Sequence, residues 1–322
     1  MKARALWIER PGCATLRSMA LCAPGPGDVL VRTLHSGISR GTESLVFRGA
    51  VPPTLTSIMR CPFQEGDFPG PVKYGYASVG RIEAGDGPLG QVVFCLYPHQ
   101  DRYVVPRAAV HVLPAGVPPG RAVLAANLET ALNGVWDAGV SPGDVVSVIG
   151  GGVVGCLVAW LCSRIVGCEV TLSDIDPGRA NIASSLGVPF SLPETAPGGC
   201  DVVFHASGTA SGLTTALSLA GFEATIIELS WYGTDRVPLP LGEHFHPNRL
   251  TIRSSQVGAI PASRRPRWDF KRRLQVVMRL LQEPCLDTLI DGTSPFSALP
   301  QTLARLSKAP GALCHRIDYE EP

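Results

Sequence analysis

The stretch GDVVSVIGGGVVG, residues 143–155, decides the fold of this chain. Its apolar run ends in a glycine turn that fits the pattern GxGxxG, with Gly150, Gly152 and Gly155 at the fixed positions. The first glycine permits a tight turn, the second lets the backbone approach a pyrophosphate, and the third lets the next helix pack on the strand. The free N–H groups at the start of that helix, at Val153 and Val154, favour phosphate oxygens. A strand, a glycine turn and a helix in this order predict a dinucleotide-binding unit.

Asp174 ends the next apolar run, nineteen residues after Gly155. A carboxylate at this place accepts hydrogen bonds from the ribose hydroxyls of NAD and repels the 2′-phosphate of NADP. Asp176 adds a second negative charge, and the first basic residue after it is Arg179. We therefore predict that the cofactor is NAD, with NADP disfavoured, and that Asp174 and Arg179 lie at its adenosine end.

Polar and aromatic residues follow two later apolar runs, residues 201–206 and 224–229. Because ligands of open parallel sheets bind beyond the carboxyl ends of the strands, these positions are further cofactor candidates. A plain turn and simple aromatic packing are the alternative interpretations. The candidates in these two loops are Ser207, Gly208, Ser230 and Trp231.

Apolar runs and helical segments alternate from about residue 121 to residue 257. This alternation predicts a parallel sheet wrapped by helices, which is the Rossmann doubly wound architecture. Residues 1–120 are rich in Gly and Pro and contain many short apolar runs, which predicts a β-rich domain. An amphipathic helix over residues 270–281 and a strand over residues 312–319 are expected near the end of the chain.

Composition limits the classes of protein that this chain can be. The 322 residues are 45% hydrophobic and 17% charged, with a net charge of +1, which excludes a disordered chain and gives no basis for binding nucleic acid or an acidic membrane. Residues 145–163 lack charge, but their four glycines favour a strand, turn and helix over a membrane span. Ten scattered cysteines and charged residues at Arg4, Glu9 and Arg10 lead us to expect a cytoplasmic protein.

Three further segments carry a family resemblance: HSGISRGTES (residues 35–44), KYGYASVG (73–80) and ALNGVWDAGVSPGD (131–144). Together with the glycine turn, they resemble segments of the medium-chain dehydrogenase/reductase family. The resemblance implies an NAD(P)-dependent enzyme with a small-molecule substrate. It also implies a GroES-like catalytic domain from residues 1–121 and 264–322, and a Rossmann domain from residues 122–263. Family members commonly pair the last Rossmann strand across a two-fold axis, so the resemblance implies a homodimer.

The positions of the family's catalytic zinc ligands are occupied here by other residues. Ser39 stands in place of the cysteine, Tyr76 in place of the histidine, and Ala126 at the third ligand position, while Ala77 replaces the following glutamate. A hydroxyl, a phenol and a methyl group do not supply a zinc ligand set. We therefore predict an enzyme without zinc. Two of the segments are most similar to the branch that contains bacteriochlorophyllide a dehydrogenase.

A site without zinc must stabilise the substrate oxygen with protein donors. The resemblance makes Tyr76, Ser39, Lys73 and Glu129 the candidate catalytic residues, with Lys73 lowering the pKa of the Tyr76 phenol. Arg40, beside the lost cysteine, is a candidate for the cofactor pyrophosphate. The alternative for Tyr76 is that its ring only fills the space left by the metal.

The function that these expectations favour is the interconversion of a secondary alcohol and a carbonyl on an apolar or cyclic substrate. Two alternatives stay open at this point. The chain could reduce a conjugated C=C bond, as zinc-free quinone and enoyl reductases of the family do, or it could bind NAD without catalysis.

Overall fold

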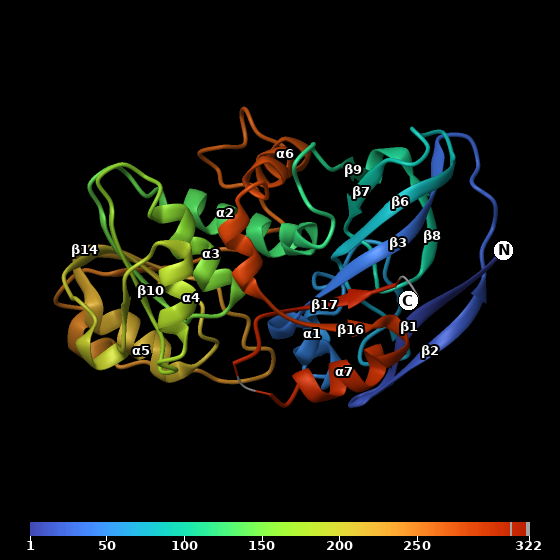
Figure 1. Cartoon of the computed structure of the whole chain (residues 1–322). Coiled ribbons are helices and arrows are strands. Elements are labelled where there is room, and N and C mark those ends of the chain that lie inside the picture. Colours follow the sequence, from blue (N-terminus) through green and yellow to red (C-terminus); the bar gives the residue numbers. More distant parts are fainter. Residues whose placement is uncertain (310, 320–322) are drawn as a thin grey trace. The chain divides into compact units, whose positions relative to one another are not determined.

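The computed structural model describes residues 1–309 and 311–319. The chain forms two compact units (Figure 1). Unit 1 comprises Met1–Ala126 and Met278–Pro322, and unit 2 comprises Asn127–Val277. Both ends of the sequence therefore belong to unit 1, and unit 2 is a single continuous segment.

Unit 2 is built on a six-stranded parallel sheet with the strand order β12-β11-β10-β13-β14-β15. Chain order reverses at β10, because the chain moves outward from it first through β11 and then, in the other direction, through β13. The carboxyl end of β10 is thus the topological switch point, where open α/β sheets bind ligands. The strands are β10 (Val145–Ile149), β11 (Glu169–Ser173), β12 (Phe190–Ser191), β13 (Cys200–His205), β14 (Ala220–Glu228) and β15 (Thr251–Ser254).

Helices connect and cover these strands. The helix after the glycine turn, α3, packs against β10 and β11 and beside α4, whereas α5 packs against β10, β13 and β14. All side chains from Gly155 to Cys162 in α3 are buried, which explains why that segment carries no charge. The helices are α2 (Ala125–Ala138), α3 (Val153–Cys162), α4 (Arg179–Leu186), α5 (Ala210–Leu219) and α6 (Phe270–Leu280), with a short π-helical turn at Leu241–Phe245.

Unit 1 contains two sheets. The seven-stranded sheet has the order β16-β17-β3-β6-β7-β9, with β8 also paired to β3, and the four-stranded sheet has the order β2-β1-β5-β4. Apolar side chains from β3, β6, β7 and β8, including Val31, Ile82 and Tyr103, form a buried cluster. The strands are β1 (Lys2–Arg10), β2 (Cys13–Ala20), β3 (Asp28–Ser39), β4 (Glu65–Gly66), β5 (Val72–Lys73), β6 (Ser78–Gly85), β7 (Val92–Cys95), β8 (Arg102–Pro106), β9 (Val110–Val112), β16 (Ile290–Pro295) and β17 (Cys314–Asp318).

The last strand, β17, runs antiparallel to β3 and pairs Cys314 with Ser39. This pairing places the segment before α1 in the middle of the seven-stranded sheet. Unit 1 also contains two α-helices, α1 (Arg40–Phe47) and α7 (Leu299–Leu306). Short 3-10 turns occur at Pro53–Leu55, Arg107–Ala109, Arg121–Leu124, Pro284–Leu289 and Phe296–Ala298, and one more, Pro193–Thr195, lies in unit 2.

The predicted α/β class, with a β-rich part and a Rossmann sheet, is confirmed. The sequence interpretation missed the long N-terminal hairpin of β1 and β2, and it missed α1 and α7. Helix α1 is short and begins in the segment that resembles the family's ligand loop, and α7 has Pro300 near its start. Within the described residues, no helix is long and apolar enough to cross a membrane.

Candidate functional site

The glycine turn between β10 and α3 has the geometry that its sequence predicts. Gly150 has φ +108°, and a Cβ there would lie 2.6 Å from the Ser207 backbone nitrogen. A Cβ at Gly155 would lie 1.9 Å from the Gly150 carbonyl oxygen. Both positions therefore require glycine. At Gly152, the N-cap of α3, a Cβ would meet no described atom within 4 Å, so the backbone there is open to a ligand.

Asp174, which follows β11, hydrogen-bonds to the backbone of this turn. Its Oδ2 accepts a hydrogen bond from the Gly151 N–H at 2.5 Å, and its Oδ1 accepts one from the Asp176 N–H at 2.8 Å. These two bonds fix the carboxylate beside the start of α3. A carboxylate held in this place suits ribose hydroxyl donors, which fits the adenosine half of NAD.

Arg179 packs against the same turn. A Cβ at Gly151 would lie 3.1 Å from Arg179 Cγ and 3.2 Å from Asp174 Oδ2, so both side chains pack against Gly151. Arg179 Nε is 3.7 Å from Asp176 Oδ2, and the Arg179 side chain is buried. The adenosine end of the predicted site thus contains two carboxylates and one guanidinium.

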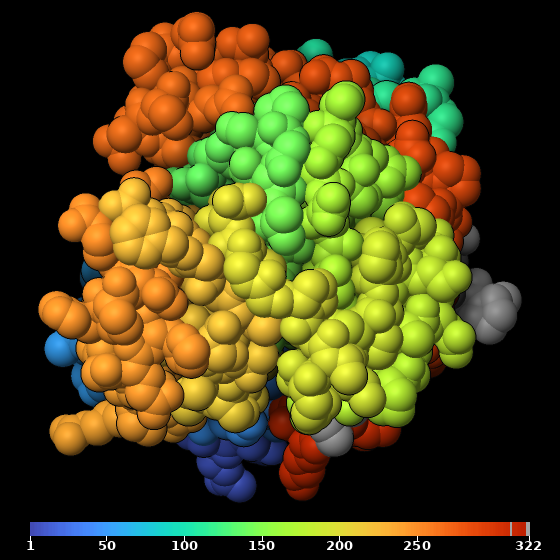
Figure 2. Space-filling model, turned by 90° about the vertical axis from the view of Figure 1, so that its left-hand side faces the viewer, coloured from blue at the N-terminus to red at the C-terminus, as the bar shows by residue number. Residues whose placement is uncertain are grey.

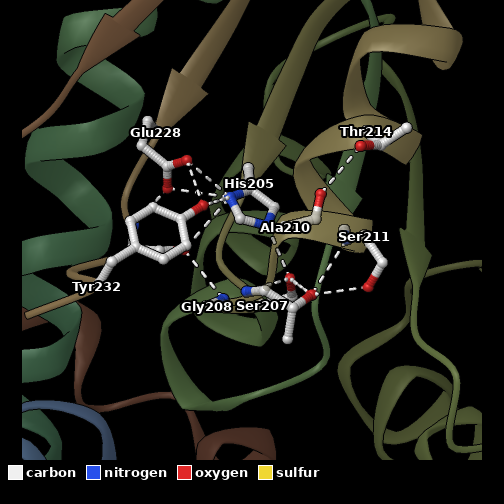
Figure 3. A network of polar contacts seen from close by, with 11 residues as sticks. His205, Ser207, Gly208, Ala210, Ser211, Thr214, Glu228 and Tyr232 are labelled. Carbon is white, nitrogen blue, oxygen red and sulfur yellow. Dashed lines mark hydrogen bonds and ion pairs between the residues drawn. The ribbon is translucent and has the colours of Figure 1, made fainter. Parts of the chain in front are cut away.

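The loops after β13 and β14 are joined by a polar network around His205 (Figure 3). The buried imidazole is 2.9 Å from Glu228 Oε2 through Nδ1 and 2.7 Å from Ser207 Oγ through Nε2. Tyr232 donates a hydrogen bond from its hydroxyl to Glu228 Oε2 at 3.0 Å, and the Ser230 N–H donates one to Glu228 Oε1 at 2.6 Å. Burial raises the pKa of the Glu228 carboxyl, but the bonds from His205, Ser230 and Tyr232 outweigh it and hold that pKa below its ordinary value.

The sequence analysis did not assign a functional role to His205 or Glu228, and it considered Tyr232 only as an apolar wall beside Trp231. A signal was present, because each of two apolar runs, VVFH and TIIE, ends in a titratable residue at the carboxyl end of a parallel strand. His205 and Glu228 are direct register partners across β13 and β14. The predicted residues Ser207, Gly208 and Ser230 lie in the same network, in which the Gly208 N–H donates to Ser230 Oγ.

Trp231, the remaining candidate in this loop, is half-buried. Its indole Nε1 is buried without a hydrogen-bond partner among the residues that the structure describes. A buried donor without an acceptor is costly unless a ligand supplies one. Trp231 and the open backbone at Gly152 therefore both fit a site that binds a dinucleotide.

In unit 1, Tyr76 lies in a second polar network. Its phenol is hydrogen-bonded to the side chains of Ser39 and Thr42. Burial, and next the negative charge of Glu43, raise the pKa of Tyr76 above its ordinary value. Tyr76 consequently remains a neutral phenol, which can donate a hydrogen bond to a bound oxygen.

Glu43 and His99 form the buried end of this network. Glu43 accepts a hydrogen bond from the Ser39 N–H at 2.8 Å, and its other oxygen is 2.9 Å from His99 Nε2. His99 Nδ1 is 2.7 Å from Ser36 Oγ, which is 3.0 Å from the Tyr319 hydroxyl. The sequence analysis gave no role to Glu43, because its partner His99 lies fifty-six residues later, in the segment after β7.

Lys73 is engaged by partners other than Tyr76. Its buried ammonium group is ion-paired with Glu65 and donates a hydrogen bond to Gln100 Oε1 at 2.9 Å. The expectation that Lys73 lowers the pKa of Tyr76 is wrong, because that pKa is raised and Lys73 is not among its causes.

Glu129 and Arg40 also have protein partners. Glu129 Oε1 is 3.1 Å from Arg273 Nε, and both side chains are buried between α2 and α6 of unit 2. This ion pair gives Glu129 a structural role, since it balances the charge of a buried guanidinium. Arg40, the first residue of α1, donates a hydrogen bond to the Ala309 carbonyl at 3.2 Å.

The residues present do not fit a catalytic zinc ion. Ser39 and Tyr76, at two of the family's ligand positions, hydrogen-bond to each other, and Ala126 has no donor atom. Across residues 1–309 and 311–319, no group of three His, Cys, Asp or Glu side chains could hold a metal. No mechanistic step is therefore assigned to zinc.

No protein-family model matches the chain. Among curated proteins, it is 26% identical over 316 residues to D-guloside 3-dehydrogenase of Escherichia coli strain K12, covering 85% of this chain and 87% of that protein. A shorter stretch of 85 residues is 34% identical to 2-desacetyl-2-hydroxyethyl bacteriochlorophyllide A dehydrogenase of Cereibacter sphaeroides, covering 26% of this chain and 22% of that protein.

Solved dehydrogenases share the fold over the whole chain. L-idonate 5-dehydrogenase from Escherichia coli K-12 superposes with a TM-score of 0.80 at 15% identity, covering 99% of both chains. An alcohol dehydrogenase from Escherichia coli CFT073, complexed with NADH, superposes with a TM-score of 0.77 at 16% identity, also covering 99% of both.

Fold and site thus define a nicotinamide-dependent dehydrogenase of the alcohol dehydrogenase-like type. In sequence and fold, the chain is similar to dehydrogenases of the medium-chain dehydrogenase/reductase type.

Proposed function

We propose that the chain is an NAD-dependent dehydrogenase that interconverts a secondary alcohol and a carbonyl without catalytic zinc. The observation that carries this proposal is the hydrogen-bonded pair of Ser39 and Tyr76, which occupies two ligand positions of the zinc enzymes and leaves a neutral phenol there. Asp174, fixed by two backbone N–H groups, supports the choice of NAD.

Bound NAD supplies the acceptor or donor of the hydride. During carbonyl reduction, negative charge develops on the substrate oxygen, and a preorganised donor stabilises it. Tyr76, with its raised pKa, acts as that donor, and Ser39 and Thr42 hold its hydroxyl in place. A single well-placed donor of this kind contributes roughly 10²–10³ in rate.

A ring-bearing substrate is favoured by the names of the relatives, which include a dehydrogenase of a D-guloside and one of a bacteriochlorophyllide. The test is reduction of NAD⁺, followed at 340 nm, with a panel of polar and apolar cyclic secondary alcohols, and product analysis of the reverse reaction. Formation of an alcohol from a ketone supports the proposal. Saturation of a C=C bond, or NADH binding without turnover, contradicts it.

We also propose a cytoplasmic homodimer that pairs through β15. This strand is at one end of the six-stranded sheet, and its exposed residues lie within the orange surface of Figure 2. An edge strand with free backbone groups is a ready surface for pairing with a second copy.

A further inference from the structure

A buried histidine links the two loops at the carboxyl ends of β13 and β14. His205 has no solvent-exposed side-chain surface, and both of its ring nitrogens are engaged (Figure 3). A buried imidazole with two polar partners fixes the relative position of those partners, because losing either bond leaves a polar group without compensation.

The Nδ1 side of the ring holds the loop after β14. Nδ1 is 2.9 Å from Glu228 Oε2 and 3.3 Å from both Ser230 Oγ and the Tyr232 hydroxyl. The ring planes of His205 and Tyr232 are nearly parallel, with centroids 6.3 Å apart. The Glu228 carboxylate is therefore the common partner of the imidazole, one backbone N–H and one phenol.

The Nε2 side of the ring holds the loop after β13. Ser207 Oγ is 2.7 Å from Nε2 and 3.0 Å from Thr209 Oγ1, and Thr209 caps α5 by accepting a hydrogen bond from the Gly212 N–H. A Cβ at Gly212 would lie 2.1 Å from Ser207 Oγ, so the hydroxyl is packed under the first turn of α5. Ser207, His205 and Glu228 are ordered like a hydrolytic triad, but here the Ser207 hydroxyl joins its loop to the residue that caps α5.

The same loop touches the dinucleotide turn. The backbone nitrogen and Cα of Ser207 lie 2.6 and 2.7 Å from where a Cβ of Gly150 would be. The Gly208 N–H, one residue on, donates to Ser230 Oγ in the other loop. Because the loop after β13 contacts both the loop after β14 and the turn at Gly150, a shift of either loop would also move the backbone beside that turn.

We propose that His205 is a positioning residue for the cofactor: it holds the loops of Ser207 and Ser230 together against Gly150, so that the affinity for NAD(H) depends on this imidazole. The inference rests on the proposed dinucleotide binding and adds to it the side chain that organises this edge of the site. His205 itself contacts no ligand in this account. The titratable side chains that face it are Glu228 and Tyr232, both from β14 and the loop after it, while Ile149 of β10 and Gly212 of α5 are uncharged.

The test is the dissociation constant for NADH, measured by fluorescence titration of the full chain. His205→Phe keeps a ring and removes both polar contacts, and we expect at least about a tenfold weaker affinity. His205→Gln, which keeps a donor and an acceptor, is expected to retain more affinity than His205→Phe. His246→Phe replaces an exposed histidine of the same unit and is the matched control, with no expected change.

A double-variant cycle separates positioning from a general loss of stability. Ser207→Ala and Tyr232→Phe remove one partner from each side of the ring. If the imidazole couples the two loops, the double variant changes the NADH dissociation constant by a factor that differs from the product of the two single-variant factors. Loss of stability alone lowers Tm without such coupling. This cycle also decides the matter if the His205 variants do not fold.

Each outcome has a defined meaning. Equal NADH affinity in wild type, His205→Phe and His205→Gln, or strictly multiplicative effects in the cycle, overturns the inference alone. Absence of NADH binding by the wild-type chain overturns the proposed function together with it. Weaker binding with coupled effects supports both.

Discussion

Glu43 Oε2 lies 2.9 Å from His99 Nε2, and the two side chains are 3% and 1% exposed. They join α1 to the segment after β7 inside unit 1, next to the Ser39 and Tyr76 pair. Removing one partner of a buried pair leaves the other uncompensated, which costs about 3–5 kcal/mol.

His99→Ala is therefore expected to lower the stability of the protein by about 3 kcal/mol or more. The measurement is calorimetric unfolding, and the control is Arg249→Ala, which breaks a pair whose side chains are 70% and 55% exposed. An exposed pair contributes about 0–1 kcal/mol. Equal effects of the two substitutions would show that the Glu43–His99 pair is not a stabilising element.

Tyr76→Phe removes only the hydroxyl that we propose as the donor to the substrate oxygen. We expect kcat to fall by about a hundredfold, with NADH affinity unchanged. Ser39→Ala is expected to have a smaller effect, because Thr42 still holds the phenol. An unchanged kcat in Tyr76→Phe would leave Tyr76 as a packing residue.

The pH dependence of carbonyl reduction tests the same phenol. A raised pKa keeps Tyr76 protonated above the pH of about 10 at which an ordinary tyrosine ionises. The donor is then present at neutral pH and is lost only as pH rises through the raised value. We expect no loss of kcat with a tyrosine-like pKa between pH 7 and 10, and the same profile in Lys73→Met. A decline near pH 8 that Tyr76→Phe abolishes would contradict the account.

Asp174→Asn keeps the size of the side chain and removes its charge. We expect the ratio of NADPH to NADH affinity to rise at least about tenfold, equivalent to about 1.4 kcal/mol, because repulsion of the 2′-phosphate is lost while Arg179 remains. Binding of both cofactors is measured by fluorescence titration, with Glu169→Gln, an exposed residue at the start of β11, as the control. If the ratio is unchanged, Asp174 does not determine the preference for NADH over NADPH.

Ile252→Lys places a charge in the middle of β15, the proposed pairing edge. We expect a dimer in the wild-type chain and a monomer in this variant by light scattering at micromolar concentration. Leu192→Lys, next to β12 at the opposite edge of the sheet, is expected to remain dimeric. A monomeric wild type would rule out the proposed assembly.

Local patterns in the sequence were sufficient for the dinucleotide unit. The turn at Gly150, the helix after it and the place of Asp174 depend on residues within one βαβ segment, so their positions follow from spacing and steric requirements. The polar networks could not be predicted in this way. His205 meets Glu228, and Glu43 meets His99, only through strand register and chain packing, which the one-dimensional pattern does not contain.

Two candidate residues illustrate the same limit. Lys73 and Glu129 lie in segments that resemble the family, and each is ion-paired: the buried Lys73 with the exposed Glu65, and Glu129 with the buried Arg273. A lysine or glutamate in a matched segment looks the same in sequence whether it faces a substrate or balances a buried charge.

The central claim is that this enzyme transfers hydride without zinc. The most direct measurement is the zinc content of the purified, active protein by elemental analysis, combined with kcat before and after prolonged chelation. We predict well under one zinc per chain and an unchanged kcat. One zinc per chain, with activity lost on chelation and restored by added zinc, would contradict the account.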